Sequence, residues 1–118
     1  KGHPSLGGRV MFVNAPVGTP EAGFVIMNDP EADNDKIQDL VKKGYLVRTR
    51  ADAGTWEARN SDLTRFEKAL KSGAHVISTD YYLPDSSLET GYRVRLENDK
   101  VALCNPLFSI NRCDINEE

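Results

Sequence analysis

This 118-residue chain has only two histidines and two cysteines, and it has no surplus of positive charge. Eighteen acidic against fifteen basic side chains give a formal net charge of −3, which argues against a nucleic-acid partner held by phosphate neutralisation. The longest apolar run, which ends at Met27, is far shorter than the roughly 20 residues of a membrane-spanning helix. With 39% apolar and 28% charged residues, composition instead favours an ordinary soluble globular domain.

Familiar catalytic and metal-binding patterns are also missing. The chain has no Ser-His-Asp order, no metal-spaced His/Cys cluster and no glycine-rich phosphate loop. His75 precedes a predicted strand, which is the wrong end for catalysis in parallel α/β folds, and His3 lies near the start. The acidic stretch from Asp29 to Asp35 lacks the glycine and glutamate spacing of a calcium loop and suits helix capping instead. The residues therefore predict no catalytic or metal site of their own.

Short apolar segments alternate with amphipathic ones along the chain. The patterns predict strands at 9–13, 22–27, 46–50 and 76–79, and helices at 33–43 and 61–73, the second capped by Ser61. A hairpin of 92–96 with 101–103 is expected to follow. Two consecutive βαβ units imply parallel strands, and so an α/β fold. A complete (β/α)₈ barrel needs about 250 residues, so this chain is too short to be one.

Polar side chains follow the predicted strands, at the end where parallel α/β folds bind ligands. On the strand at 46–50, alternation places three of them on one face: Arg48, Arg50 and Asp52. The opposite face carries Val47 and is expected to pack against helices, so the arginine face looks onto something polar. Arginine donors suit a phosphate or a polyol, while a solvated edge strand is the alternative.

The strand at 76–79 places a carboxylate near those arginines. Asp80 ends this strand and can pair with Arg48 or Arg50 across the sheet, since adjacent strands lie about 4.8 Å apart. We expect Arg48 and Asp80 to converge on one face, with Arg50 closer to the mouth of the site. An unpaired buried arginine is costly, which is why an acidic partner, a phosphate or water is needed there.

Further candidates for substrate binding lie in the loops after the strands. Tyr81 and Tyr82 can stack on a ring-shaped ligand or pack in the core, and Asn28 opens the polar loop after the strand at 22–27. Trp56 lies in the loop after the strand at 46–50, where it is either a helix-packing residue or a pocket wall.

The two cysteines, Cys104 and Cys113, enclose a short loop near the end of the chain. A disulfide between them is expected to stabilise the fold by roughly 2–3 kcal/mol through loop entropy. Such a bond suits a secreted protein, although two buried thiols in a cytosolic protein are the alternative.

Five segments together are more specific than any of them alone. They are Gly8–Phe12, Asn28–Pro30, Gly44–Asp52, Leu70–His75 and Ser78–Tyr82. This series resembles the calcium-dependent phosphoinositide phospholipase C family over most of residues 8 to 106, and Cys104–Pro106 looks like the tail of that family.

The resemblance implies that residues 1–106 are the C-terminal part of a (β/α)₈ TIM barrel with a β-hairpin tail, and that 107–118 form a tail tethered by the disulfide. The catalytic histidines and the calcium ligands of the family lie upstream, so this segment alone is expected to be inactive and to bind no metal. Its expected partners are an inositol phospholipid or related phosphodiester, a transient membrane surface and the N-terminal half of the barrel. The residues expected to bind substrate are Arg48, Arg50, Asp52, Asp80, Tyr81, Tyr82 and Asn28.

Two other readings stay open. One is a glycerophosphodiester phosphodiesterase, which uses the same barrel on a soluble substrate, although Arg48 replaces an aromatic residue typical of that relative. The other is a non-catalytic α/β binding module that acts at this length.

Overall fold

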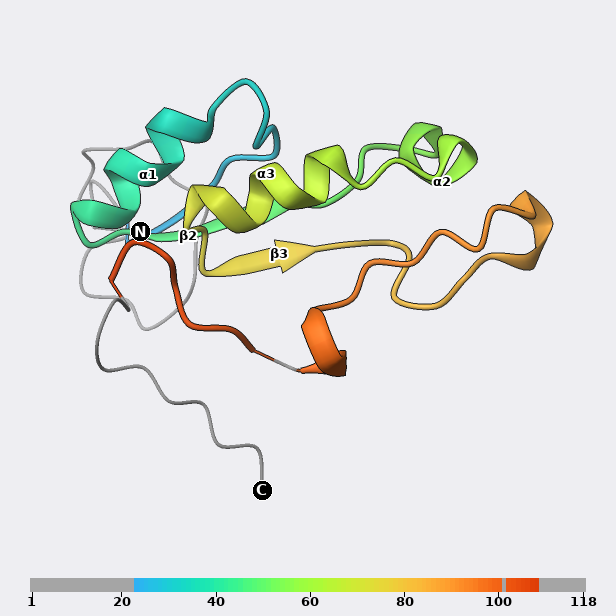
Figure 1. The fold of residues 1–118 in the computed structure, drawn as a ribbon. Coiled ribbons are helices and arrows are strands. Elements are labelled where there is room, and N and C mark those ends of the chain that lie inside the picture. Colours follow the sequence, from blue (N-terminus) through green and yellow to red (C-terminus); the bar gives the residue numbers. More distant parts are fainter. Residues whose placement is uncertain (1–22, 101, 109–118) are drawn as a thin grey trace, which may run out of the picture.

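The computed structural model describes residues 23–100 and 102–108, which form a small parallel sheet with helices between its strands (Figure 1). The strands are β1 (Phe24–Ile26), β2 (Leu46–Arg50) and β3 (Val76–Ser78). They are ordered β1-β2-β3 and both pairs are parallel. This confirms the predicted α/β class and three of the predicted strands, whereas the strand predicted at 9–13 lies outside the described residues.

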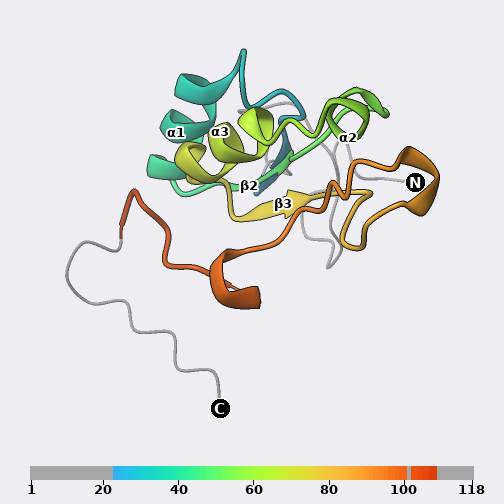
Figure 2. The same ribbon diagram turned by 45° about the vertical axis from the view of Figure 1, so that its right-hand side comes forward.

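Two helices cover one face of the sheet, as Figures 1 and 2 show. They are α1 (Asn34–Lys42) and α3 (Thr64–Ser72), which pack against each other and against β2. The side-chain amide of Asn34 in α1 donates a hydrogen bond to the backbone oxygen of Lys68 in α3 (2.9 Å). The helical layer is thereby joined by a polar bond as well as by packing.

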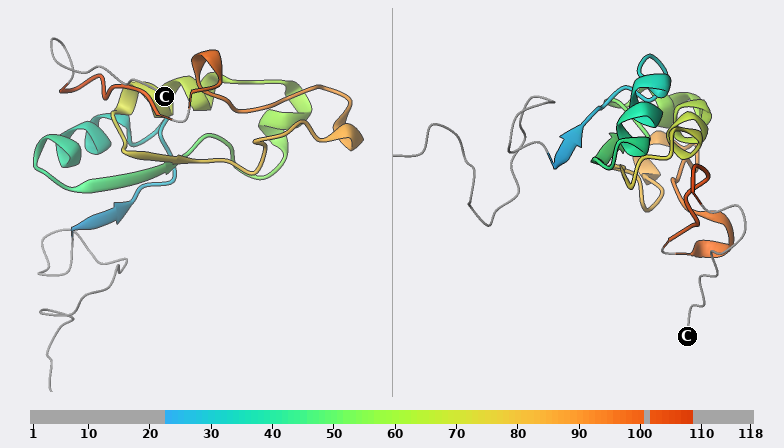
Figure 3. Two further views of the ribbon diagram at one scale, coloured as in Figure 1. Left: turned by 90° about the horizontal axis from the view of Figure 1, so that it is seen from below. Right: turned by 90° about the vertical axis from the view of Figure 1, so that its left-hand side faces the viewer.

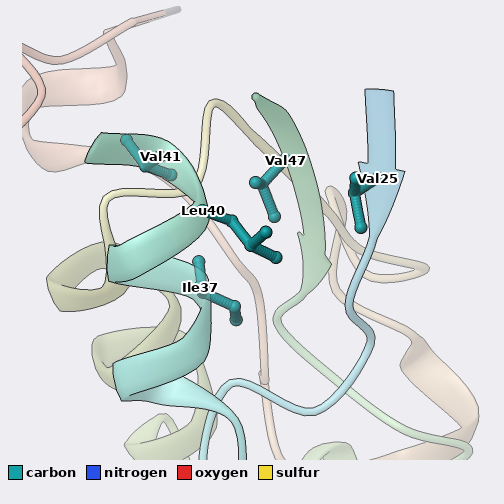
Figure 4. Close-up of a cluster of buried hydrophobic side chains, with 5 residues drawn as sticks. All are labelled: Val25, Ile37, Leu40, Val41 and Val47. Atoms are coloured by element: carbon teal, nitrogen blue, oxygen red, sulfur yellow. The ribbon is translucent and has the colours of Figure 1, made fainter. Parts of the chain in front are cut away.

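The main core lies between α1 and the sheet (Figure 4). Ile37, Leu40 and Val41 recur at helical spacing and point from α1 toward Val47 of β2 and Val25 of β1. Fully burying such side chains stabilises a fold by about 1.5–3 kcal/mol each. The spacing of apolar residues thus determines which side of α1 meets the sheet.

The start of the second predicted helix is wrong. A separate short helix, α2 (Trp56–Asn60), comes first, and Ser61 ends it in the left-handed conformation (φ 51°). The carboxylate of Asp62 then accepts a hydrogen bond from the backbone N–H of Thr64 at the start of α3 (2.9 Å). Ser61 is therefore the C-cap of α2 rather than the N-cap of α3, because its left-handed backbone ends α2 before α3 begins at Thr64.

The predicted hairpin tail does not form among the described residues. Residues 92–96 and 102–103 are not strands, and the turn between them is the 3-10 helix η2 (Glu97–Asp99). Arg93 and Arg95 both bind the carboxylate of Asp99, at 2.9 and 3.5 Å. Arg93 and Arg95, which alternate as strand residues do, thus both bind Asp99, and residues 92–96 form no strand pairing. A first 3-10 helix, η1 (Ser86–Leu88), lies in the loop before them.

The end of the described chain returns to the helical layer. It runs alongside β3, on the side of the sheet opposite to β1 (Figure 3). The side-chain amide of Asn105 donates to the backbone oxygen of Gly73 (2.7 Å), and Leu107 packs against the main core. Gly73 ends α3 with φ 76°, and a Cβ there would lie 2.5 Å from the Leu107 side chain. Only glycine meets both the turn and the close contact.

Candidate functional site

The two faces of β2 separate apolar from charged side chains, as the alternation predicts. Val47 and Thr49 are fully buried on the helical side. Arg48 and Arg50 are half-buried on the other side, which neither α1 nor α3 covers (Figure 2). This arginine side is called the open face of the sheet, since among the described residues the two helices pack on the opposite face.

Arg50 is held by two carboxylates at the carboxyl ends of the strands. Its Nη2 atom lies 2.7 Å from Oδ2 of Asp80 and 3.6 Å from Oδ1 of Asp52. Its Nε atom donates a hydrogen bond to the backbone oxygen of Asp52 (3.1 Å). The charge of this guanidinium is compensated within the site.

Arg48 has a different partner. Its Nε and Nη2 atoms donate to the hydroxyl of Ser78 at 3.4 and 3.3 Å, and within residues 23–100 and 102–108 it forms no ion pair. Of the two arginines predicted as partners of Asp80, Arg50 is the one that pairs with it, whereas Arg48 bonds to Ser78. Since Arg50 lies opposite Ser78 in the register, each arginine reaches two residues further along β3, and Asp80 therefore meets Arg50.

The described part of the site therefore has one compensated and one uncompensated arginine on one face. Sequence reasoning identified both arginines and Asp80 but did not assign a partner to Ser78. The register of the parallel strands, which a sequence pattern does not give, is the signal that pairs them.

The remaining predicted binding residues divide into buried and exposed ones. Asp52 is fully buried, and Tyr81 packs in a second core cluster with Ala58 and Tyr92. The Tyr81 and Tyr92 rings meet edge to face, with centroids 5.4 Å apart. Tyr82 is 71% exposed. Only the second of the two adjacent tyrosines is thus placed to meet a ligand without a rearrangement.

Two side chains near the loops are also exposed. Asn28 follows β1, and its backbone oxygen accepts a hydrogen bond from the guanidinium of Arg65. Trp56 begins α2 and is 60% exposed, so it is not a helix-packing residue. The loops at the carboxyl ends of β1, β2 and β3 thus all present polar or aromatic side chains to solvent.

Tyr92 is a buried polar group that sequence reasoning missed. Its hydroxyl has no hydrogen-bond partner among the described residues. Burial, together with the nearby carboxylates of Asp52 and Glu57, raises the pKa of Tyr92 to about 12. The residue was predicted as part of a strand, and no sequence pattern signals its burial.

The described residues do not fit a calcium ion. They contain no group of three or more acidic, histidine or cysteine side chains able to hold a metal. The carboxylate of Asp52 accepts from the Thr79 hydroxyl and the Asp80 N–H, and Asp80 binds Arg50. Nδ1 of His75 accepts from the backbone N–H of Val47 (3.2 Å) at the opposite end of the sheet. These oxygens and this nitrogen already have protein donors.

No helix in the part of the chain that the structure describes has the length and hydropathy to cross a membrane. Parallel βαβ units define an α/β protein, and its arginines and carboxylates lie at the strand ends where such folds bind ligands. The family model of calcium-dependent phosphoinositide phospholipase C matches residues 1–106, and the chain belongs to that family. No curated protein and no solved structure gives a significant match.

Proposed function

We propose that this chain is the substrate-binding part of a phospholipase C that cleaves phosphatidylinositol-type lipids. The observation that carries the proposal is Arg48, a half-buried guanidinium with no carboxylate partner in the described ranges, on the open face of a sheet from this family. A phosphodiester supplies the negative charge that this position lacks. Arginine also presents planar, paired donors that match phosphate oxygens.

The neighbouring Arg50–Asp80 pair suits the inositol ring. Its guanidinium donates and its carboxylate accepts, so the pair can bind adjacent hydroxyls of a polyol, and its opposed charges disfavour a second phosphate there. Tyr82 and Asn28 are exposed in the flanking loops and are proposed to pack on the ring and bond to it. This substrate-binding role follows from the open face and its charges.

The reaction proposed for the full-length protein starts with attack of the inositol 2-hydroxyl on the neighbouring phosphate, which releases diacylglycerol. We propose that residues upstream supply the general base and the general acid and hold the calcium ion, which would stabilise the developing charge. In the described part, Arg48 positions the phosphate and the Arg50–Asp80 pair orients the ring. Proximity and orientation of this kind lower a barrier without any proton transfer by these side chains.

We also propose that the sheet is part of a (β/α)₈ barrel, with the open face toward its interior. Leu46 and Val76 begin β2 and β3 on this face and are 46% and 48% exposed, and we propose that further chain of the barrel covers them. A groove of about 830 Å³ lies beside β3, between α3 and the tail. We propose that the next barrel strand occupies this groove, because an uncovered strand edge favours pairing.

The predicted disulfide bears on where the protein acts. Cys113 lies outside the described residues, so the Cys104–Cys113 bond stays a prediction, and with it the secreted location and the tail at 107–118. We propose the bond, the secreted location and the tethered tail. We also propose transient binding at the membrane surface where the lipid substrate resides. Alkylation without reductant that labels two thiols per chain would contradict the disulfide and the secreted location.

The test of the function is hydrolysis of phosphatidylinositol vesicles by the full-length protein, with calcium or with a chelator. We expect calcium-dependent release of diacylglycerol and no turnover by the isolated 118 residues. Hydrolysis of glycerophosphoinositol in preference to the lipid would support the glycerophosphodiesterase alternative. Turnover by the isolated chain would contradict the assignment of catalysis to upstream residues.

A further inference from the structure

Asp52 is a buried carboxylate that joins the ends of two strands. It lies two residues after β2, with no exposed surface. One oxygen accepts from the Thr79 hydroxyl and the other from the backbone N–H of Asp80 (3.3 Å), both just beyond β3. The Thr79 hydroxyl in turn accepts from the N–H of Tyr81 (2.9 Å). One side chain thus fixes three consecutive residues of the loop after β3.

The same residue contacts Arg50. Its backbone oxygen accepts from Nε of Arg50 (3.1 Å), and its Oδ1 atom lies 3.6 Å from Nη2. Nη2 also bonds to Asp80 at 2.7 Å. Asp52 therefore contacts both members of the Arg50–Asp80 pair, which is partly exposed, while having no exposed surface itself.

We propose that Asp52 is a positioning residue, which orients Arg50 and Asp80 for the substrate instead of touching it. Its role in catalysis rests on the proposed function, whereas its role in fixing the pair does not. Arginine has several rotatable bonds, and restricting them before binding removes an entropic cost from the binding step. The negative charge of Asp52 also stabilises the guanidinium in the orientation that faces Asp80.

The first test measures orientation without substrate. Asp52→Asn keeps the shape of the side chain but removes its charge. In NMR spectra of ¹⁵N-arginine-labelled chain, we expect the side-chain N–H signals of Arg50 to shift and broaden in this variant. Asp85→Asn is the matched control, because Asp85 likewise accepts from a backbone N–H and a hydroxyl, both of Ser87, but lies in no ion pair of the described residues. Unchanged Arg50 signals in Asp52→Asn would overturn the proposal.

The second test uses phosphatidylinositol hydrolysis by the full-length protein. We expect Asp52→Asn to raise KM about tenfold with a smaller change in kcat, since a hydrogen bond to a charged group is worth about that factor. In an Arg50→Ala background it should cause a clearly smaller further rise in KM, because only Asp80 is left for Asp52 to orient. A merely structural role would instead be additive with Arg50→Ala, and that result would overturn the proposal.

A third variant addresses failure to fold. Thr79→Val removes the donor hydroxyl and leaves the carboxylate of Asp52 in place, and we expect it to perturb Arg50 in the same direction but less. If the Arg50 signals respond as expected while the wild-type protein does not hydrolyse the lipid, the proposed function fails and the positioning role stands. If the lipid is hydrolysed and neither variant alters KM or the Arg50 signals, the positioning role fails alone.

Discussion

The two faces of the three-stranded sheet take alternate residues of the same strands, yet they differ in what covers them. On the covered face, Val25 and Val47 meet the apolar side of α1 and are buried (Figure 4). On the open face, Arg48 bonds to Ser78 of β3, and Arg50 bonds to Asp52 just after β2 and to Asp80 just after β3. The covered face thus contributes buried apolar side chains to the core, whereas the open face carries partly exposed arginines that lie outside the core.

This difference teaches how one strand separates stability from binding. A buried apolar side chain contributes through area removed from water and through packing, and its loss is felt in the free energy of unfolding. A half-buried arginine contributes little there, because surface ion pairs and hydrogen bonds are nearly balanced by water. Substitutions on the two faces should therefore give opposite results in stability and in activity.

The largest expected effect is on the covered face. Ile37→Ala should lower the free energy of unfolding by about 3 kcal/mol, because it removes a fully buried side chain and leaves a cavity. Urea denaturation followed by circular dichroism measures this change. Leu46→Ala is the matched control, since Leu46 lies on the open face, and it should cost less than about 1 kcal/mol. Equal losses in the two variants would contradict the comparison.

The open face gives the next effect, in activity. Arg48→Ala in the full-length protein should lower kcat/KM for phosphatidylinositol about 100-fold, as expected for loss of a donor to a charged phosphate. Its unfolding free energy should change by less than about 0.5 kcal/mol. Arg59→Ala is the control, because Arg59 is exposed on α2 and bonds to Thr55. A loss of stability with full activity would reverse the roles of the two faces.

A smaller effect concerns the buried hydroxyl of Tyr92. The unfolded chain loses the tyrosine proton near pH 10 and the folded chain near pH 12, so stability should fall as pH rises through that range. Tyr92→Phe should remove this loss and leave stability at pH 7 unchanged or higher, since the hydroxyl has no partner in the described part of the chain. Unfolding curves at pH 7 and at pH 11 measure both. The exposed Tyr82→Phe variant should behave like the wild type.

The smallest effect lies on the outer surface of α1. Lys43 and Asp39 form an exposed ion pair at 2.8 Å, and this pair raises the pKa of Lys43. Lys43→Ala should nevertheless leave urea denaturation unchanged, because water screens such a pair. A loss comparable to that of Ile37→Ala would show that surface charge, and not the covered face, holds the helix to the sheet.

The sequence predicted the central elements well because their signals are local. Strand β2 has the predicted bounds of 46–50, and α1 ends where Lys42, Lys43 and Gly44 indicate. The division of Arg48 from Val47 likewise follows from the two-residue repeat of a strand. The prediction of a hairpin was wrong because Arg93 and Arg95 alternate with apolar residues as in a strand, whereas both side chains bind Asp99 of η2. A local pattern cannot foresee that contact.

Alternation, helical spacing and the family motifs were therefore determined by the sequence alone, since each depends on neighbours along the chain. Only the tertiary structure decided which carboxylate meets which arginine. In the parallel register Arg48 lies opposite Val76 and Arg50 lies opposite Ser78. Each arginine side chain bonds to the residue two positions after its register partner, which is Ser78 for Arg48 and Asp80 for Arg50. The tertiary structure also decided that Asp52 is buried beneath that pair, because burial depends on the loop after β3 folding over it.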